Sequence, residues 1–206
     1  MPIVGIAMSL RSSYRIIAPF YDALIKGYFN RIRAESIKSL PVSGNQRIFI
    51  DGIGTGLDLP YLPSDHRYVG IDLTETMLNR ARLHTTNLQV DLVQGDSMSL
   101  PFPDNTFDHG ILHLILAVVP DSVACLREAA RVVKTGGSLL VMDKFLRPGQ
   151  TAPIRRLFSP LTGKLVTKLD VVFEEVLKEV SGLTVENDQA VAARGWFRAI
   201  RLKKIN

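Results

Sequence analysis

The stretch Ile48-Phe-Ile-Asp-Gly-Ile-Gly-Thr-Gly-Leu-Asp58 decides the fold, because an apolar run breaks there into three glycines at alternate positions. The run is typical of a buried strand, and the glycines predict a tight turn into a helix. Glycine is required where a ligand presses against the backbone, since a side chain would block its approach. We therefore interpret Gly52, Gly54 and Gly56 as a ligand-binding loop that follows the first strand.

A second apolar run, residues 68–71, ends at Asp72, twenty residues after Gly52. A carboxylate at the end of the second strand of such a unit is the residue type that holds the hydroxyls of a ribose. The glycine spacing is G-x-G-x-G rather than the dinucleotide fingerprint G-x-G-x-x-G, because Leu57 stands three residues after Gly54. These features predict a nucleoside-containing ligand at the carboxyl edge of a parallel sheet.

The length of 206 residues suits one α/β domain, and no stretch reads as a linker or a repeat. The single cysteine, Cys125, argues against an internal disulfide framework and a cysteine-cluster metal site. No other group of side chains has metal-ligand spacing, so we expect no metal. The apolar residues 1–10 are too few for a membrane span and lack the basic start of a signal peptide. A cytoplasmic protein is expected, with peripheral contact at the inner membrane face as an open alternative.

Charge is distributed unevenly along the chain, whose net charge is +5. Residues 1–50 carry seven Lys/Arg against two Asp/Glu, residues 51–143 six against twelve, and residues 144–206 twelve against six. Solvation of exposed faces is one interpretation of the basic ends. The other is that they lie together at the rim of the site and meet an anionic substrate or a membrane surface.

Hydrophobic periodicity alternates between strand-like and helical along the chain. An N-terminal helical region is predicted over 14–40. Strands are predicted at 47–52, 67–72, 89–94, 107–112 and 138–143. Helices are predicted at 75–86 with Thr74 as N-cap, at 121–133 with Asp121 as N-cap and Gly136-Gly137 as C-cap, and at 170–180. The stretches 183–188 and 196–203 have no helix between them, so we expect an antiparallel pair at one edge of the sheet.

With these residues in place, the chain resembles the class I S-adenosylmethionine-dependent methyltransferases over nearly all of its length. One such motif is weak, whereas five in the right order are specific. The five are Gly52-Ile-Gly-Thr-Gly56, Val69-Gly-Ile-Asp72, Thr74-Glu-Thr-Met-Leu78, Gln94-Gly-Asp-Ser-Met-Ser-Leu-Pro-Phe-Pro-Asp-Asn-Thr-Phe-Asp108 and Leu126-Arg-Glu-Ala-Ala-Arg-Val-Val-Lys-Thr-Gly-Gly-Ser-Leu-Leu-Val141.

Pattern and resemblance together predict an α/β fold with a Rossmann-like, seven-stranded, mostly parallel sheet. An antiparallel C-terminal edge strand and helices on both faces complete the expected architecture. The whole chain, 1–206, is expected to be a single domain, with an N-terminal helical lid segment at 1–45 and a cofactor-binding core at 46–206.

The resemblance implies S-adenosylmethionine as the cofactor and S-adenosylhomocysteine as the product. It implies that Asp72 holds the ribose and that Asp96 accepts from the exocyclic amine of adenine. The structural alternatives are a helix cap for Asp72, a turn for Asp96, and plain core packing for Met77 and Met98. The expected cofactor-binding residues are Asp51, Gly52, Gly54, Gly56, Asp72, Leu73, Met77, Gly95, Asp96, Ser97, Met98 and His113.

One position departs from the family pattern. Family members usually carry an acidic residue two positions before the first glycine, where it holds the methionine amino group. Here that position is Ile50, and the acid, Asp51, stands directly before Gly52. A shift of one residue on a strand reverses the direction of the side chain. Asp51 is therefore expected either to point away from the ligand or to be brought back by a rearranged turn.

Three residues are candidates for catalysis. His113, just beyond the fourth strand, is placed to take a proton from a nucleophile, with a hydrogen bond to a loop carbonyl as the alternative. Lys144 ends the fifth strand, where it either lines the substrate mouth or forms a surface pair with Asp143. In similar methyltransferases the segment that holds Tyr21-Asp22 folds over the cofactor as a lid, and simple packing is the alternative.

The acceptor class is narrowed by what the sequence lacks. Leu112-His-Leu114 stands where a DNA amino-methyltransferase would carry Asn/Asp-Pro-Pro-aromatic, and there is no separate recognition domain for a protein or a large RNA. A small-molecule or lipid acceptor is expected, because the pattern is similar to quinone-biosynthesis C-methyltransferases and to soluble bacterial phosphatidylethanolamine N-methyltransferases. A non-catalytic S-adenosylmethionine-binding protein remains an alternative, and a nicotinamide oxidoreductase is disfavoured by the glycine spacing.

Overall fold

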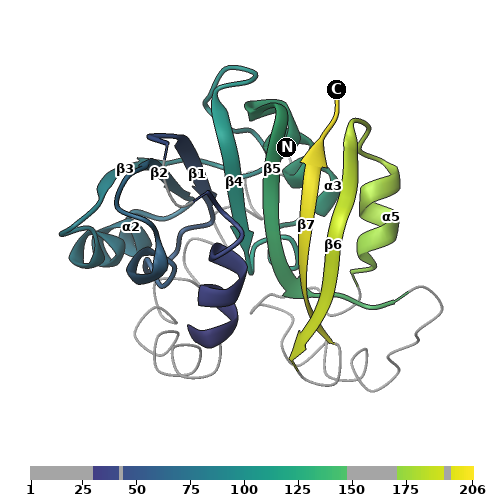
Figure 1. Cartoon of the computed structure of the whole chain (residues 1–206), viewed down its shortest axis with the longest axis horizontal. Helices are drawn as coiled ribbons and strands as arrows, with labels where there is room; N and C mark the ends of the chain where they lie inside the picture. Colours follow the sequence, from purple (N-terminus) through teal and green to yellow (C-terminus); the bar gives the residue numbers. More distant parts are fainter. Residues whose placement is uncertain (1–29, 42–43, 148–170, 193–195) are drawn as a thin grey trace, which may run out of the picture.

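Seven strands form one sheet in the order β3-β2-β1-β4-β5-β7-β6 (Figure 1). The computed structural model describes residues 30–41, 44–147, 171–192 and 196–206 of the chain. Strands β3, β2, β1, β4 and β5 run parallel, whereas β7 is antiparallel to both β5 and β6. The strands are β1 Arg47–Asp51, β2 Arg67–Asp72, β3 Gln89–Gln94, β4 Phe107–His113, β5 Val133–Lys144, β6 Leu183–Ala192 and β7 Phe197–Lys204. The predicted sheet is thus confirmed, and its C-terminal strand lies between β5 and the edge strand β6.

Helices cover both faces of the sheet, as predicted. They are α2 Glu75–Ala81, α3 Ser122–Val132 and α5 Phe173–Lys178, with the 3₁₀ turns η1 Leu59–Tyr61 and η2 Arg82–His84; residues 30–37 are also helical. Phe49 packs in one apolar cluster with residues of α3 and α5, whereas Ile48 and Ile50 pack in another with Ile37 and Leu78. Because successive strand residues point to opposite faces, α3 and α5 cover one face, and α2 and the helical residues 30–37 cover the other (Figure 1).

The N-cap predictions had different outcomes at the two helices. Asp121 caps α3 as predicted, because its carboxylate accepts from the backbone N–H groups of Val123 at 2.9 Å and Ala124 at 3.0 Å. Thr74 stands at the N-cap of α2 but makes no capping hydrogen bond. Its hydroxyl donates to Asp72 Oδ1 at 3.1 Å, while its oxygen accepts from no N–H group of the first turn. Thr74 is thus the N-cap residue as predicted, but its side chain does not cap the helix.

The C-cap predicted at Gly136-Gly137 is also wrong. Helix α3 ends at Val132, and its C-cap is the extended residue Val133, whose N–H donates to the carbonyl of Ala129. Gly136 lies within β5 with φ +82°, where the pairing between β4 and β5 shifts register. Gly136 therefore accommodates an irregularity of the strand, which is a common use of a left-handed glycine.

The remaining boundaries differ mainly in length. The helix predicted at 75–86 ends earlier, at Ala81, and continues only as the 3₁₀ turn η2. The helix predicted at 170–180 is described from Phe173, and the strands predicted at 138–143 and 183–188 are longer. Most of the predicted lid segment 1–45, including Tyr21, lies outside the described residues. No helix among the described residues is long and apolar enough to cross a membrane.

Candidate functional site

The glycine loop after β1 holds its backbone in the left-handed region, with φ +62° at Gly52, +55° at Gly54 and +82° at Gly56. A Cβ on Gly56 would lie 3.0 Å from the Cα of Ala81, so this glycine allows the loop to pack against α2. A Cβ on Gly54 would meet nothing nearer than the carbonyl oxygen of Gly52 at 3.8 Å. The loop therefore presents bare backbone to open space at Gly54, as a ligand-binding loop requires.

Asp72, at the end of β2, is joined to this loop by its side chain. Its Oδ2 accepts from the backbone N–H of Gly54 at 3.0 Å, and its Oδ1 accepts from the backbone N–H of Thr74 at 2.9 Å. Burial raises the pKa of Asp72, and the hydrogen bonds from Thr74 and Gly54 offset part of this effect. The carboxylate and the open backbone at Gly54 thus lie side by side.

The segment after β3 is joined to the end of β2. The backbone N–H of Gly95 donates to the carbonyl of Asp72 at 3.0 Å, and a Cβ on Gly95 would lie 2.7 Å from Ile71 Cδ1. Asp96 then forms a turn in which its Oδ1 accepts from the backbone N–H of Met98 at 2.8 Å. The ends of β1, β2 and β3 therefore carry the predicted loop and both predicted nucleoside-binding carboxylates at one edge of the sheet.

The other predicted residues around this edge are partly buried. Met77 is buried in α2, and Met98 is half-buried against the core on the α3 face. The backbone carbonyl of Leu73 accepts from the Gln94 side chain at 3.0 Å. The cofactor contacts expected of these residues remain predictions.

Asp51 is directed toward α3, on the same face of β1 as Phe49. Its carboxylate is 1% exposed and accepts from Ser97 Oγ at 2.5 Å and from Cys125 Sγ at 3.5 Å. Burial, together with the negative charges of Asp72 and Asp96, raises the pKa of Asp51 to about 7. Ile50 packs on the opposite face, so the displaced acid does point in the reverse direction from the family's acidic position.

His113 belongs to a buried polar array that joins three distant parts of the chain. Its Nδ1 lies 2.8 Å from Asp58 Oδ1, and its Nε2 lies 3.0 Å from Ser36 Oγ. Arg33 Nη1 lies 2.8 Å from the same oxygen of Asp58. Burial alone would raise the pKa of Asp58, but Arg33 and His113 together hold it well below its usual range. Arg33, Asp58 and His113 are each less than 5% exposed.

Arg33, Ser36 and Asp58 were not among the site residues predicted from the sequence. Asp58 stands alone between Leu57 and Leu59 in a buried stretch, and a lone charged residue in such a stretch is a signal for a buried partner. Nothing local identifies that partner, because His113 is 55 residues away along the chain.

The ends of β4 and β5 complete the site region. Leu114 has φ +62°, a conformation that is uncommon for a residue with a side chain and that concentrates at functional sites. Asp143 is buried and accepts from the backbone N–H groups of Ala117 at 2.9 Å and Lys144 at 2.8 Å. Burial, partly offset by these hydrogen bonds, raises the pKa of Asp143 to about 6. Lys144 itself is half-buried at the end of β5; its catalytic role stays a prediction.

The part of the chain that the structure describes contains no group of three or more His, Cys, Asp or Glu side chains arranged to hold a metal ion.

Comparison with known proteins finds similarity to methyltransferases. Residues 51–141 match the family model of a methyltransferase domain. The chain is 29% identical over 163 residues to the phosphatidylethanolamine N-methyltransferase of Cereibacter sphaeroides, covering 77% of this chain and 80% of that protein. It is 43% identical over 75 residues to a demethylmenaquinone methyltransferase of Bacillus licheniformis, covering 36% of this chain and 32% of that protein. The chain therefore matches about a third of the length of this second relative.

Solved structures share the fold. One chain of a Haloferax volcanii complex that contains the Trm112 methyltransferase activator superposes with a TM-score of 0.79, at 16% identity, covering 95% of this chain and 97% of that chain. At this level of identity the likeness shows the arrangement of strands and helices alone.

Proposed function

We propose that this chain is an S-adenosylmethionine-dependent methyltransferase that transfers the methyl group to a small-molecule or lipid acceptor, with S-adenosylhomocysteine as the product. The observation that carries this proposal is the hydrogen bond from Gly54 N–H to Asp72 at 3.0 Å. It joins Asp72, a carboxylate placed to bind ribose hydroxyls, to Gly54, the loop glycine beside which a Cβ would meet open space.

Two features support this cofactor: the open backbone at Gly54 and the carboxylates of Asp72 and Asp96 at the same sheet edge. We assign Asp72 to the ribose hydroxyls and Asp96 to the adenine amine, with the glycine loop between them. The cofactor is a cation at its sulfonium, and the region around the loop is acidic. S-adenosylmethionine supplies an already activated methyl group. The protein therefore has to bind both substrates, hold the acceptor in line with the breaking methyl–sulfur bond, and exclude water.

The acceptor that we propose first is a lipid amine of the phosphatidylethanolamine type. The relative with this substrate in its name aligns over 77% of the chain, whereas demethylmenaquinone methyltransferases align over 36% to 54% of it. The basic charge of residues 1–50 and 144–206 suits the surface of an anionic membrane. On the same charge argument, we propose that the protein is cytoplasmic and contacts the inner face of the membrane peripherally.

An amine must lose its proton before it attacks the methyl group. His113, oriented by Asp58, is the candidate base that the described residues offer at the end of β4. Lys144 and Tyr21 remain the other candidates for contact with the acceptor.

The cofactor half of the proposal is tested by calorimetric titration with S-adenosylmethionine, S-adenosylhomocysteine and NAD. We expect both sulfur nucleosides to bind and NAD not to bind. Asp72→Asn should weaken both affinities by on the order of tenfold or more, because a charge-assisted hydrogen-bond acceptor is lost. Asp65→Asn is the matched control, since this carboxylate is exposed and touches only its neighbour Ser64.

The acceptor half is tested by transfer of a labelled methyl group into lipid. Vesicles of phosphatidylethanolamine with an anionic lipid should become labelled, and vesicles in which phosphatidylcholine replaces phosphatidylethanolamine should not. Labelling of a demethylmenaquinone analogue instead would move the acceptor to the quinone class.

A non-catalytic binding protein of the same fold is the second candidate. It is favoured by Asp51, whose carboxylate is already satisfied by Ser97 and Cys125, and by the apolar Ile50 at the family's acidic position. Tight binding of S-adenosylmethionine without methyl transfer to either acceptor class would support it.

A further inference from the structure

The side chains of Asp51 and Ser97 join the end of β1 to the turn after β3. Ser97 Oγ donates to Asp51 Oδ1 at 2.5 Å, and the two residues are 46 positions apart in the chain. Strands β1 and β3 are not neighbours, because β2 lies between them in the sheet. The hydrogen bond therefore connects two loops that the strand pairing itself does not bring together.

Asp51 is the fixed partner of this pair. It is the last residue of β1 and stands opposite Ile71 of β2 in the strand pairing. Two residues later, the backbone N–H of Ile53 donates to the carbonyl of Ile71 at 2.9 Å. A buried side chain on a paired strand has little freedom to move, so it can orient a loop residue that it contacts.

Ser97 is the loop partner, and it lies in the turn that carries Asp96. The backbone N–H of Ser99 donates to the carbonyl of Asp96 at 3.0 Å, and that of Met98 donates to Asp96 Oδ1 at 2.8 Å. Both hydrogen bonds lie within the turn, so they define its shape but not its position relative to the glycine loop. The hydrogen bond from Ser97 to Asp51 does define that position, because Asp51 directly precedes the loop.

Three hydrogen bonds thereby connect the ends of β1, β2 and β3 in a closed ring. Gly54 N–H donates to the carboxylate of Asp72 at 3.0 Å, and Gly95 N–H donates to the carbonyl of Asp72 at 3.0 Å. The hydrogen bond from Ser97 to Asp51 closes the ring on the buried side. The carboxylates expected at the ribose and at the adenine are therefore held relative to each other from two sides.

Packing alone does not explain an acid at the end of β1. Burial is the main cause that raises the pKa of Asp51, so the ionised carboxylate is destabilised at this position. An apolar side chain avoids such a cost, as Phe49 does two residues earlier in the apolar cluster on the same face. The loop position that Asp51 fixes explains the residue better than its contribution to the core.

We propose that Asp51 is a positioning residue for the cofactor, which acts through Ser97 to hold the Asp96 turn in the conformation that binds adenine. In this role it makes no contact with the methionine end of the cofactor. The inference rests on the proposed binding of S-adenosylmethionine. Without the hydrogen bond the turn populates other conformations, and the apparent affinity falls with the fraction of chains that remain competent to bind.

The test compares S-adenosylhomocysteine with methylthioadenosine, which keeps the adenosine and the sulfur but lacks the amino-acid group. Calorimetry should show that Asp51→Ala and Ser97→Ala each bind both ligands about tenfold more weakly, because a buried hydrogen bond is lost. The double variant should lose about as much affinity as either single variant. Asp51→Asn should stay within about threefold of the wild type for both ligands, because its amide oxygen still accepts from Ser97.

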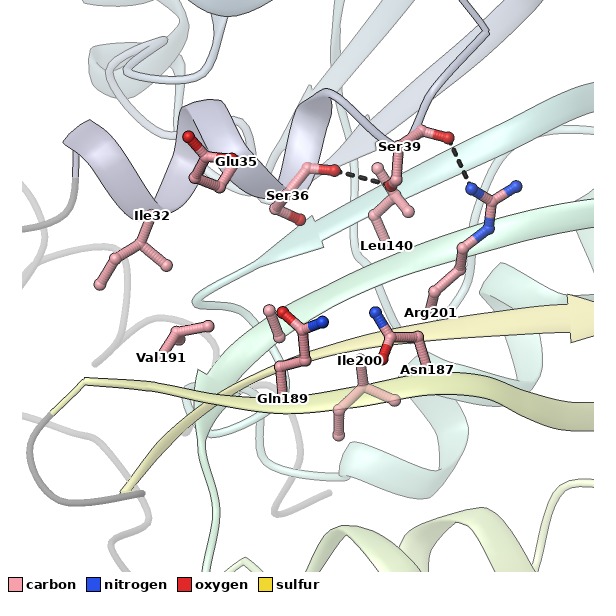
Figure 2. Close-up of a pocket in the computed structure, with 11 residues that line it drawn as sticks. Ile32, Glu35, Ser36, Ser39, Leu140, Asn187, Gln189, Val191, Ile200 and Arg201 are labelled. Atoms are coloured by element: carbon pink, nitrogen blue, oxygen red, sulfur yellow. Dashed lines mark hydrogen bonds between the residues drawn. The ribbon is translucent and has the colours of Figure 1, made fainter.

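Ser39→Ala is the matched control, since it also removes a serine hydroxyl that makes a hydrogen bond. Ser39 Oγ donates to the carbonyl of Ser36 at 2.7 Å, in the groove between the helical segment 30–37 and strands β5, β7 and β6 (Figure 2). This groove lies away from the ends of β1, β2 and β3, so the variant should bind both ligands as the wild type does. If Asp51→Ala does not fold, Ser97→Ala carries the test, because it removes a single oxygen atom.

Two outcomes would overturn this role of Asp51. One is a loss of affinity for S-adenosylhomocysteine in Asp51→Asn while methylthioadenosine binds as before, which would show direct contact with the methionine end. The other is unchanged binding of both ligands by folded Ser97→Ala. In both cases the wild type still binds the nucleosides, so the proposed cofactor stands. A folded wild type that binds neither ligand would overturn the proposed cofactor and this inference together.

Discussion

The carboxylate of Asp72 accepts a hydrogen bond from the backbone N–H of Gly54 at 3.0 Å. This contact joins the end of β2 to the middle of the glycine loop, which are 18 residues apart in the chain. The Asp72 carboxylate and the exposed backbone of Gly54 therefore lie side by side, where one ligand can contact both. Substitutions in the loop test the contribution of the backbone separately from that of Asp72.

Gly54→Ala should cost affinity for S-adenosylmethionine out of proportion to its cost in stability. An alanine at φ +55° costs about 1–2 kcal/mol of left-handed backbone strain, and its methyl group would fill the open space beside the loop. Gly136→Ala is the matched control, because φ is +82° there and a Cβ would meet nothing within 4 Å. Chemical denaturation should show that both variants lose a similar free energy of unfolding. Calorimetry should show weaker binding of S-adenosylmethionine in Gly54→Ala alone. Equal binding by both variants would contradict the assignment of the loop.

Asp51 should make the free energy of unfolding depend on pH. An unfolded aspartate ionises near pH 4, whereas folded Asp51 keeps its proton up to about pH 7. Its contribution is therefore fully present below about pH 4 and is lost as the pH rises to 7. Asp51→Asn keeps an acceptor for Ser97 and removes the titration.

The free energy of unfolding of Asp51→Asn minus that of the wild type should thus rise from pH 4 to pH 7 and then level off. Urea denaturation across this range measures the difference, in which the contribution of Asp143 cancels because its pKa does not depend on Asp51. A difference that stays constant with pH would show that Asp51 is ionised throughout.

Removing one charge of the Arg33–Asp58 pair should be strongly destabilising. Both side chains are 5% exposed, and an uncompensated buried charge costs about 3–5 kcal/mol. The double variant Arg33→Met/Asp58→Asn should lose less free energy of unfolding than the sum of the losses in the two single variants. A double-mutant cycle measures this difference. The exposed pair Glu35–Lys38 on the same segment is the control, and its coupling should be at most about 1 kcal/mol. Additive losses at Arg33 and Asp58 would argue against a coupled pair.

Asp121→Ala should destabilise the protein by about 1 kcal/mol, because two backbone N–H groups of α3 lose their acceptor. Thr74→Ala removes no capping hydrogen bond, but it does remove the hydrogen bond from the buried Thr74 hydroxyl to Asp72. Thermal unfolding should therefore show that the loss in Thr74→Ala shrinks in an Asp72→Ala background, whereas the loss in Asp121→Ala is the same in both backgrounds. An unchanged loss for Thr74→Ala in the Asp72→Ala background would contradict this role of Thr74.

Most of the backbone could be predicted from the sequence, because strand and helix patterns are local. The apolar run from Ile48 to Ile50 indicated a strand, and the glycines after it indicated a tight turn, as found. The helix expected after this turn is only the 3₁₀ turn η1. The order of acidic residues behind successive strands predicted that Asp72 and Asp96 would meet at one sheet edge, and parallel strands require this. Two local predictions failed: the Thr74 side chain stands at the N-cap of α2 without accepting a hydrogen bond there, and Gly136 belongs to an irregular strand rather than to a helix end.

The partners of buried polar side chains were decided only by the tertiary structure. Sequence spacing could show that Asp51 was displaced by one residue, but not that Ser97 and Cys125 would satisfy it. Likewise, Asp58 and His113 are 55 residues apart, and Ser36 and His113 are 77 apart. Local sequence determines backbone conformation through propensity and periodicity. Which side chains meet depends on strand order and helix placement, and these are determined by packing of the whole chain.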